Sequence, residues 1–118
     1  MASSEGRTVR QTWRLTATST IEDGETIVKL EGRVGHNGAA VLKRLGEGIV
    51  GQGVNRLTLD LSAVDYMSSA GLRTLEGLAA VLEARSGHLR LMNATDPVKL
   101  VLDLSGLSER FVDTERRQ

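Results

Sequence analysis

The chain alternates between segments with the two-residue hydrophobic period of a strand and segments with the longer period of a helix. Strand-like alternation covers residues 55–61 and 88–92, and a helical stripe covers residues 69–86 between them. A strand, a helix and a strand in this order form a right-handed crossover, in which the two strands are parallel. This alternation therefore predicts an α/β domain with parallel strands at its centre.

Two further strands precede this unit and form a hairpin. Alternation begins at Trp13, so that Trp13, Leu15 and Ala17 are expected on one buried side. Residues 22–25 contain Asp-Gly, a dipeptide typical of hairpin turns, and residues 26–31 follow as the second strand. We therefore expect the first two strands to be antiparallel.

The hairpin leads into a loop and a first helix. A glycine-containing loop is predicted over residues 32–38, in which Asn37 is a candidate cap for the helix. Residues 39–51 then show one apolar helical face, although glycines disfavour the later turns. That face consists of Val41, Leu42, Leu45 and Ile49.

The C-terminal half adds a strand and a helix. Gly87 is expected to end the helix that begins at Ser69, at the position beyond the cap where glycine is favoured. A last helix is predicted from residues 96 to 105, with Pro97 in its first turn. Residues 109–113 are a candidate edge strand. The order β-β-α-β-α-β-α predicts a single α/β domain with a mixed sheet of four to five strands and helices mainly on one face.

Length and charge narrow the classes of function. The 118 residues suit one domain, which we place at residues 12–114, between a flexible segment 1–11 and a tail 115–118. Fifteen basic and fifteen acidic residues balance, so no overall field favours nucleic acid or an anionic membrane. The sequence has no cysteine and no apolar run of membrane-spanning length, and residues 1–7 lack the apolar core of a signal peptide, so we expect a cytoplasmic protein.

Residues typical of catalysis are sparse. His36 and His88 stand alone, without a second ligand at metal-binding spacing, and are expected to be solvated. Asp60 is expected on the polar face of the sheet and Asp65 in a turn, although a carboxylate pair can in principle bind Mg²⁺ or transfer protons. We therefore expect no metal, no cofactor and no enzymatic activity.

Two successive serines, Ser68 and Ser69, stand where a parallel strand turns into a helix. A serine at this position is a helix cap by default, and both serines can be structural. The start of a helix also accommodates an added phosphate, because its backbone N–H groups and its dipole favour negative charge. The residues alone leave both roles open.

The sequence around these serines resembles the signature of the STAS domain, and in particular that of the bacterial anti-sigma factor antagonists. In that family an apolar strand ends in Asp-Leu/Ser and is followed by a short loop and Asp/Ser-Ser-x-Gly-Leu, a pattern similar to residues 57–72. Residues 30–34 resemble the family's Leu-x-Gly-x-Leu/Val segment. Residues 89–93 with Pro97, and residues 103–107, resemble its closing segment.

The resemblance implies regulation by partner switching. The unphosphorylated antagonist would bind an anti-sigma factor that is itself a serine kinase, and phosphorylation would break the complex until a PP2C-type phosphatase reverses it. By position the acceptor is Ser69 rather than Ser68. The implied partner-binding residues are Gly32, Arg33, Gly35, His36, Asn37, Asp65, Tyr66, Met67, Ser68, Ser69, Ala70, Gly71 and Arg73.

Two positions depart from the family pattern. Ser68 stands where members of the family often have Asp. Gly35 stands where the family commonly has Asp directly after the Gly-x-Leu/Val segment. The alternative function is that of a STAS scaffold or transporter accessory subunit, which resembles this chain but is never phosphorylated and acts by fixed docking. The exposed edges expected of such a sheet also permit a weak homodimer.

Overall fold

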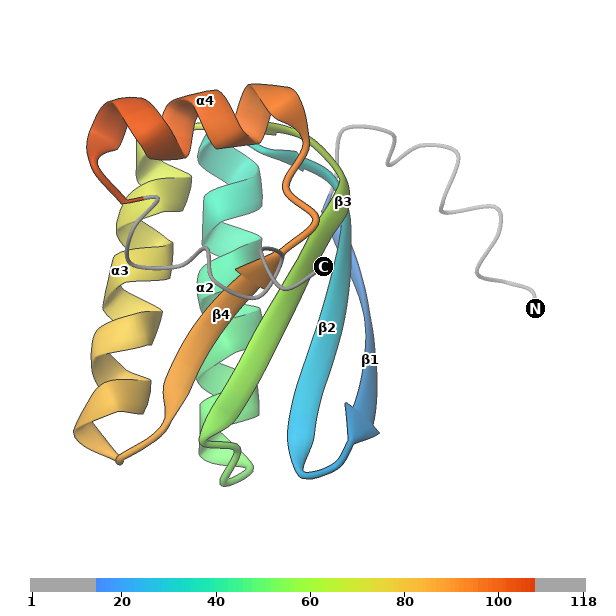
Figure 1. Cartoon of the computed structure of the whole chain (residues 1–118), viewed down its shortest axis with the longest axis vertical. Coiled ribbons are helices and arrows are strands. Elements are labelled where there is room, and N and C mark those ends of the chain that lie inside the picture. Colours follow the sequence, from blue (N-terminus) through green and yellow to red (C-terminus); the bar gives the residue numbers. More distant parts are fainter. Residues whose placement is uncertain (1–14, 108–118) are drawn as a thin grey trace.

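The strands and helices follow the order predicted from the sequence. The computed structural model describes residues 15–107. Its elements are β1 (Thr16–Glu22), β2 (Glu25–Val34), α2 (His36–Gly51), β3 (Arg56–Met67), α3 (Ser69–Ala84), β4 (His88–Met92) and α4 (Asp96–Ser105). The strands form one sheet in the order β1-β2-β3-β4, with β1 antiparallel to β2 and the other pairs parallel (Figure 1). The predicted mixed α/β sheet is confirmed.

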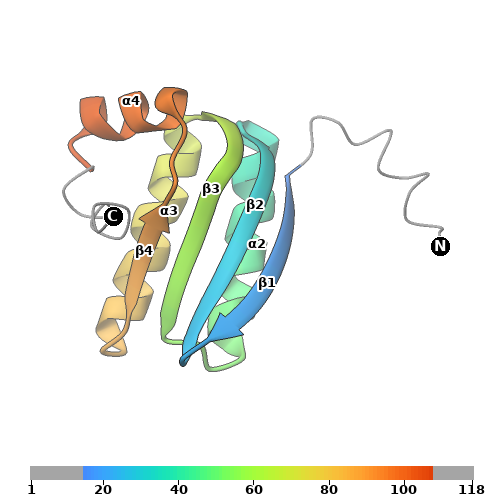
Figure 2. The ribbon, with the colours of Figure 1, turned by 45° about the vertical axis from the view of Figure 1, so that its right-hand side comes forward.

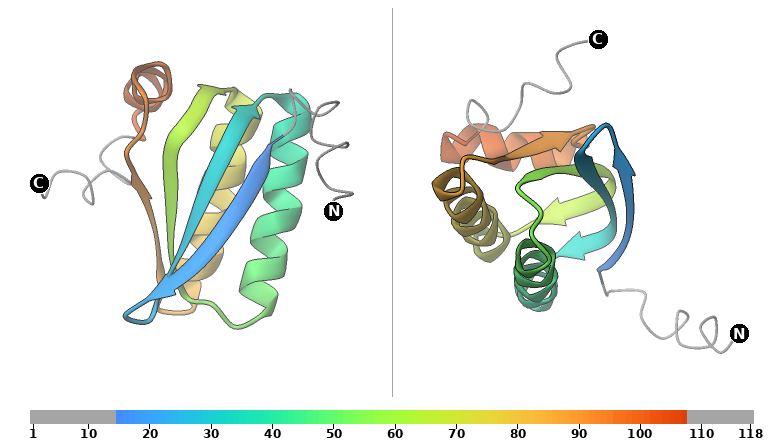
Figure 3. Two further views of the ribbon diagram at one scale, coloured as in Figure 1. Left: turned by 90° about the vertical axis from the view of Figure 1, so that its right-hand side faces the viewer. Right: turned by 90° about the horizontal axis from the view of Figure 1, so that it is seen from below.

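Helices α2 and α3 cover one face of the sheet, and α4 lies across the end at which β3 finishes (Figures 1 and 3). The start of α4 is tied to β3, because the Thr95 hydroxyl donates a hydrogen bond of 2.6 Å to the carbonyl oxygen of Val64. Both α2 and α3 begin at this same end, directly after parallel strands. The predicted placement of the helices mainly on one face is therefore confirmed.

Most of the core lies between the sheet and helices α2 and α3, and Val98 and Leu102 of α4 also belong to it. The alternating leucines of β3 and β4 and the apolar stripe of α3 are buried, as predicted. Burying such side chains contributes roughly 1.5–3 kcal/mol each. The predicted stripe and strand residues that are buried are Leu57, Leu59, Leu61, Leu72, Leu75, Leu78, Ala79, Leu82, Leu89 and Leu91.

The first strand differs from the prediction. Every residue of β1 is exposed, so Ala17 does not lie on a buried side, whereas Leu15 just before the strand is buried. The physical reason is position: β1 is the edge strand, and the helices pack on β2, β3 and β4. Trp13 lies outside the described residues.

The predicted loop over residues 32–38 is wrong. Strand β2 continues to Val34 and α2 begins at His36, so that Gly35 alone separates them. Gly35 is also the N-cap, and Asn37 lies in the first turn. The strand can run so directly into the helix because residue 38 is glycine. A side chain at this position would collide with the carbonyl group of Arg33.

Strand β3 is longer than predicted, and it places Asp65 in a strand rather than in a turn. Its pairing with β2 shifts register between Lys29 and Glu31 and again between Gly32 and Val34. These irregularities allow both strands to continue to the end of the sheet at which α2 and α3 begin.

The end of α3 uses a different residue from the one predicted. Ser86, not Gly87, adopts the left-handed conformation, with a φ of 65°. The N–H of Gly87 donates to the carbonyl of Leu82 and that of Ser86 to the carbonyl of Glu83, which is a Schellman arrangement. At the end of α4, Gly106 has a φ of 81° and stops the helix as predicted. The candidate strand 109–113 and the terminal segments lie outside the described residues.

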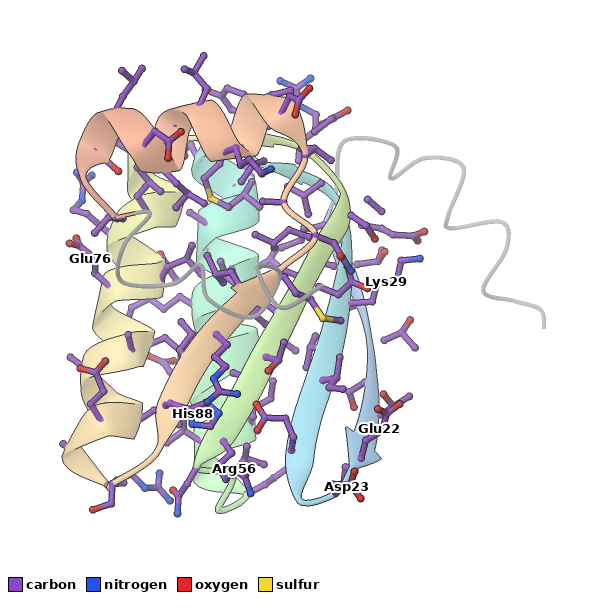
Figure 4. The ribbon with its side chains drawn as sticks, in the orientation of Figure 1. Glu22, Asp23, Lys29, Arg56, Glu76 and His88 are labelled. Atoms are coloured by element: carbon purple, nitrogen blue, oxygen red, sulfur yellow. The ribbon has the colours of Figure 1, made fainter. Side chains whose placement is uncertain are left out.

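A polar cluster lies on the open face of the sheet near the hairpin. Glu25 accepts a hydrogen bond of 2.6 Å from the Thr58 hydroxyl, and its carboxylate lies 3.0 Å from His88 Nε2 and 3.4 Å from Arg56 Nε. Figure 4 shows His88 and Arg56 at this end of the sheet. His88 therefore has a partner, contrary to the expectation of a solvated histidine. Burial raises the pKa of Glu25, but the hydrogen bonds from Thr58 and His88 and the charges of His88 and Arg56 together lower it below its ordinary value.

This cluster predicts an acid-sensitive contribution to stability. The folded pKa of Glu25 is lower than the unfolded value of about 4.3, so its contribution is present above that pH and is lost as the pH falls through the folded pKa. We expect Glu25→Gln to lower the free energy of unfolding at neutral pH and to make its decline in acid shallower. Urea unfolding across this pH range measures both effects. Glu31→Gln, at an exposed position of the same strand, controls for the loss of one charge. If the free energy of unfolding falls equally steeply in acid for both variants and the wild type, Glu25 does not make the acid-sensitive contribution.

Candidate functional site

The two adjacent serines have different environments. Ser68 is the N-cap of α3: it is half-buried, and its Oγ accepts a hydrogen bond of 3.2 Å from the backbone N–H of Gly71. Ser69 is the first residue of the helix, and it is exposed. The structure thus confirms Ser68 as a cap and leaves the hydroxyl group of Ser69 at the surface.

The start of α3 is held tightly against the end of β2. The N–H of Ser68 donates a hydrogen bond of 2.8 Å to the carbonyl oxygen of Val34. A Cβ atom at Gly71 would lie 2.6 Å from both Met67 Sδ and Val34 Cγ1, closer than van der Waals contact permits. Glycine at this motif position therefore lets the first turn of α3 pack directly on β2 and β3.

A second segment lies beside the serines. The guanidinium carbon of Arg33 lies 4.9 Å from the centroid of the Tyr66 ring, an arrangement that permits a cation–π interaction. A Cβ atom at Gly35 would lie 3.6 Å from Cε2 of the same ring. The ends of β2 and β3, distant in sequence, are therefore brought together by parallel pairing.

The predicted partner-binding residues gather at this end of the sheet, but they are not equally accessible. Met67 and Gly71 are buried, so they support the site rather than offer side chains to a partner. Gly32, Gly35, Ser68 and Ala70 are half-buried. We call the exposed group the α2/α3 edge; it consists of Arg33, His36, Asn37, Asp65, Tyr66, Ser69 and Arg73.

The α2/α3 edge is electropositive. Two helices begin there, and neither α2 nor α3 has an acidic residue in its first turn, so the positive ends of both dipoles are uncompensated. Arg33 and Arg73 add positive charge, against the single carboxylate of Asp65. The absence of Asp at position 68 reinforces this character.

A groove continues from the edge between α2 and α3, with a volume of about 730 Å³. Its lining is largely apolar or small, and its charged groups are Lys43, Glu47, Arg73 and Arg85, with His36 at the edge. Sequence reasoning missed this groove, because it requires two helix faces to be placed side by side. Its lining includes Ala39, Leu42, Val50, Ala70, Gly77, Leu78 and Val81.

Other kinds of site find no support within residues 15–107. That part of the chain contains no group of three or more His, Cys, Asp or Glu side chains that could hold a metal ion. Over the same residues, none of the helices combines the length and the hydrophobicity that a membrane span requires.

Comparisons with known proteins agree with the fold described above. The family model described as "Mlab, STAS domain" matches residues 17–113. The chain belongs to the STAS domain family. A Bordetella bronchiseptica protein named as the anti-sigma factor antagonist BtrV is 34% identical over 96 residues, which cover 81% of this chain and 83% of the relative.

Solved STAS structures agree with this assignment. The crystal structure of an anti-sigma factor antagonist from Mycobacterium paratuberculosis has a TM-score of 0.74 at 25% identity, covering 83% of each chain. SpoIIAA, a Bacillus cell fate determinant, has TM-scores of 0.70 in its unphosphorylated form and 0.64 in its phosphorylated form, at 22% and 20% identity. These two matches cover 83% of this STAS chain, and 87% and 90% of SpoIIAA, and at such identities they show the fold.

Proposed function

We propose that this STAS protein is an anti-sigma factor antagonist that binds an anti-sigma factor serine kinase through the α2/α3 edge and is released when Ser69 is phosphorylated. A PP2C-type phosphatase would reset it, and the cytoplasm would be its setting. The division of roles between the capping Ser68 and the exposed Ser69 carries this proposal. The name of the Bordetella relative and the existence of a phosphorylated form of SpoIIAA support it.

The chemistry of the site favours Ser69 as the acceptor. A kinase needs a hydroxyl group that can reach its active site, and Ser69 is exposed on the first turn of a helix. Ser68 is instead half-buried, and its Oγ already accepts the hydrogen bond from Gly71 that caps the helix, so it is less accessible to a kinase. A phosphate on Ser69 lies next to the positive end of α3, so the fold tolerates it.

The surface around Ser69 also indicates what a partner must provide. Its exposed cations and the two helix ends favour an acidic contact surface, whereas the largely apolar groove favours hydrophobic side chains. A phosphate adds roughly −1.5 to −2 charges to this surface. Phosphorylation therefore opposes the same electrostatic attraction that would bring the partner to the edge.

Acceptor identity is tested by intact mass after incubation with the cognate kinase and ATP. We expect one phosphate on the wild type and on Ser68→Ala, and none on Ser69→Ala. Ser68→Ala is the matched control, because it removes the neighbouring hydroxyl and the cap, at a cost of about 1 kcal/mol in stability. Modification of Ser69→Ala to the same extent as the wild type would reject Ser69 as the acceptor.

A further inference from the structure

Strand β1 presents an unprotected edge. It is seven residues long, all of them exposed, and along residues 16–107 no strand pairs with its outer side (Figure 2). Natural proteins protect such edges with charges, prolines, bulges or a covering element. Residues 16–21 contain no charged residue and no proline, and β1 pairs with β2 without a register shift.

The opposite edge of the sheet differs. Strand β4 has five residues, and it carries an exposed Arg90 at its centre and His88 at its start. A charged residue in the middle of a short edge strand disfavours pairing with another chain. Of the two edges, β1 is therefore the one suited to strand addition.

We propose that β1 pairs with β1 of a second copy of this chain, antiparallel, about a two-fold axis at Ser19. Ser19 is the middle residue of β1, so this register alone pairs the full strand with itself. Thr18 then lies opposite Thr20, and Ala17 lies opposite Ile21. Ile21 is 73% exposed in the single chain, and this pairing covers it.

Charge favours the antiparallel arrangement over the parallel one. The acidic residues are Glu22, the last residue of β1, and Asp23 directly after it, so they lie only at the hairpin end of the strand. Antiparallel pairing places the two acidic ends about 20 Å apart, at roughly 3.4 Å per residue, which exceeds the screening length of about 8 Å at physiological salt. Parallel pairing would place them side by side.

The size of the contact predicts weak association. Seven residues from each copy are far fewer than the roughly 20–30 residues a side of a standard interface. We therefore expect a reversible dimer at high micromolar to millimolar concentration. The two-fold axis is perpendicular to the sheet, so the helices of both copies lie on one face and the two α2/α3 edges point in opposite directions. Dimerisation is thus independent of the proposed switch at Ser69.

Sedimentation velocity of the full chain from micromolar to millimolar concentration tests the proposal. We expect concentration-dependent dimerisation of the wild type and its loss in both Ser19→Lys and Ser19→Glu, because each places like charges together at the axis. An equimolar mixture of these two variants should recover a dimer, since the charges are then opposite. Ser62→Lys, at an exposed position on β3, is the matched control and should dimerise like the wild type.

Three results would overturn the proposal: a wild type that stays monomeric at millimolar concentration, a dimer that Ser19→Lys leaves intact, or no recovery in the mixture. Far-UV circular dichroism confirms that each variant is folded. Should Ser19→Lys fail to fold, the double variant Thr18→Lys/Thr20→Lys serves in its place, because these two exposed positions lie opposite each other in the proposed pairing.

Discussion

Phosphorylation of Ser69 should weaken binding to the anti-sigma factor by at least about a hundredfold. An uncompensated charge at a closed interface costs about 3–5 kcal/mol, and a factor of one hundred corresponds to about 2.8 kcal/mol. The phosphate also cancels the positive character that Arg33, Arg73 and the two helix ends give to the edge. Isothermal titration of the phosphorylated and unphosphorylated chains with the same anti-sigma factor measures the difference.

Two variants separate charge from loss of the hydroxyl group. Ser69→Ala should bind like the unmodified protein, and Ser69→Asp should bind more weakly, though less so than the phosphorylated form because it carries less charge. Ser62→Asp is the control, since it adds the same charge on an exposed part of β3 outside the α2/α3 edge. Equal affinity of the phosphorylated and unphosphorylated forms would reject the switch and favour a scaffold that stays docked.

Gly87→Ala should destabilise the domain by at least about 3 kcal/mol, at the upper end of the usual cost of overpacking. Gly87 joins α3 to β4, and an added Cβ would collide with the backbone carbonyl group of Asn55. That carbonyl oxygen accepts a hydrogen bond of 2.9 Å from the N–H of His88, at the start of the β3–β4 pairing. The collision is with backbone, so a change of rotamer cannot relieve it.

Gly77→Ala is the matched control for this prediction. Gly77 lies within α3, and a Cβ atom there would meet nothing within 4 Å. Replacing a helix-interior glycine by alanine should stabilise the domain by about 0.5–1 kcal/mol. Urea unfolding monitored by circular dichroism compares the two variants. Similar free energies of unfolding would show that the domain can accommodate a Cβ atom between Gly87 and the carbonyl group of Asn55, contrary to the prediction.

Most of the fold could be predicted because its signals are local. The alternation over β4, the stripe of α3 and the Pro97 and Gly106 signals at α4 each depend on neighbouring residues alone, and the structure confirms them. The errors arose where long-range packing decides. Glycines at 32, 35 and 38 indicated a loop, yet the contact of Gly38 with Arg33 lets a strand run directly into a helix.

The candidate site was predicted only in part, because some of its features depend on local sequence and others on tertiary packing. The motif placed Ser68 and Ser69 at a helix start, and the pattern allowed either serine to be a cap. The hydrogen bond from Gly71 distinguishes them, and it depends on the backbone geometry of the turn. The burial of Met67 and the groove between α2 and α3 depend on tertiary packing, which no local pattern encodes.

The backbone hydrogen bond between Ser68 and Val34 has a consequence for how the proposed switch would act. Ser68 is held to β2 by a backbone hydrogen bond, and a Cβ atom at Gly71, three residues further on, would collide with Met67 and Val34, so this turn has little room to shift. If Ser69 is phosphorylated as proposed, we expect the phosphate to act through the charge that it adds to this surface rather than through a rearrangement of the domain. Such a signal would be local, and it would require no second conformation of the domain.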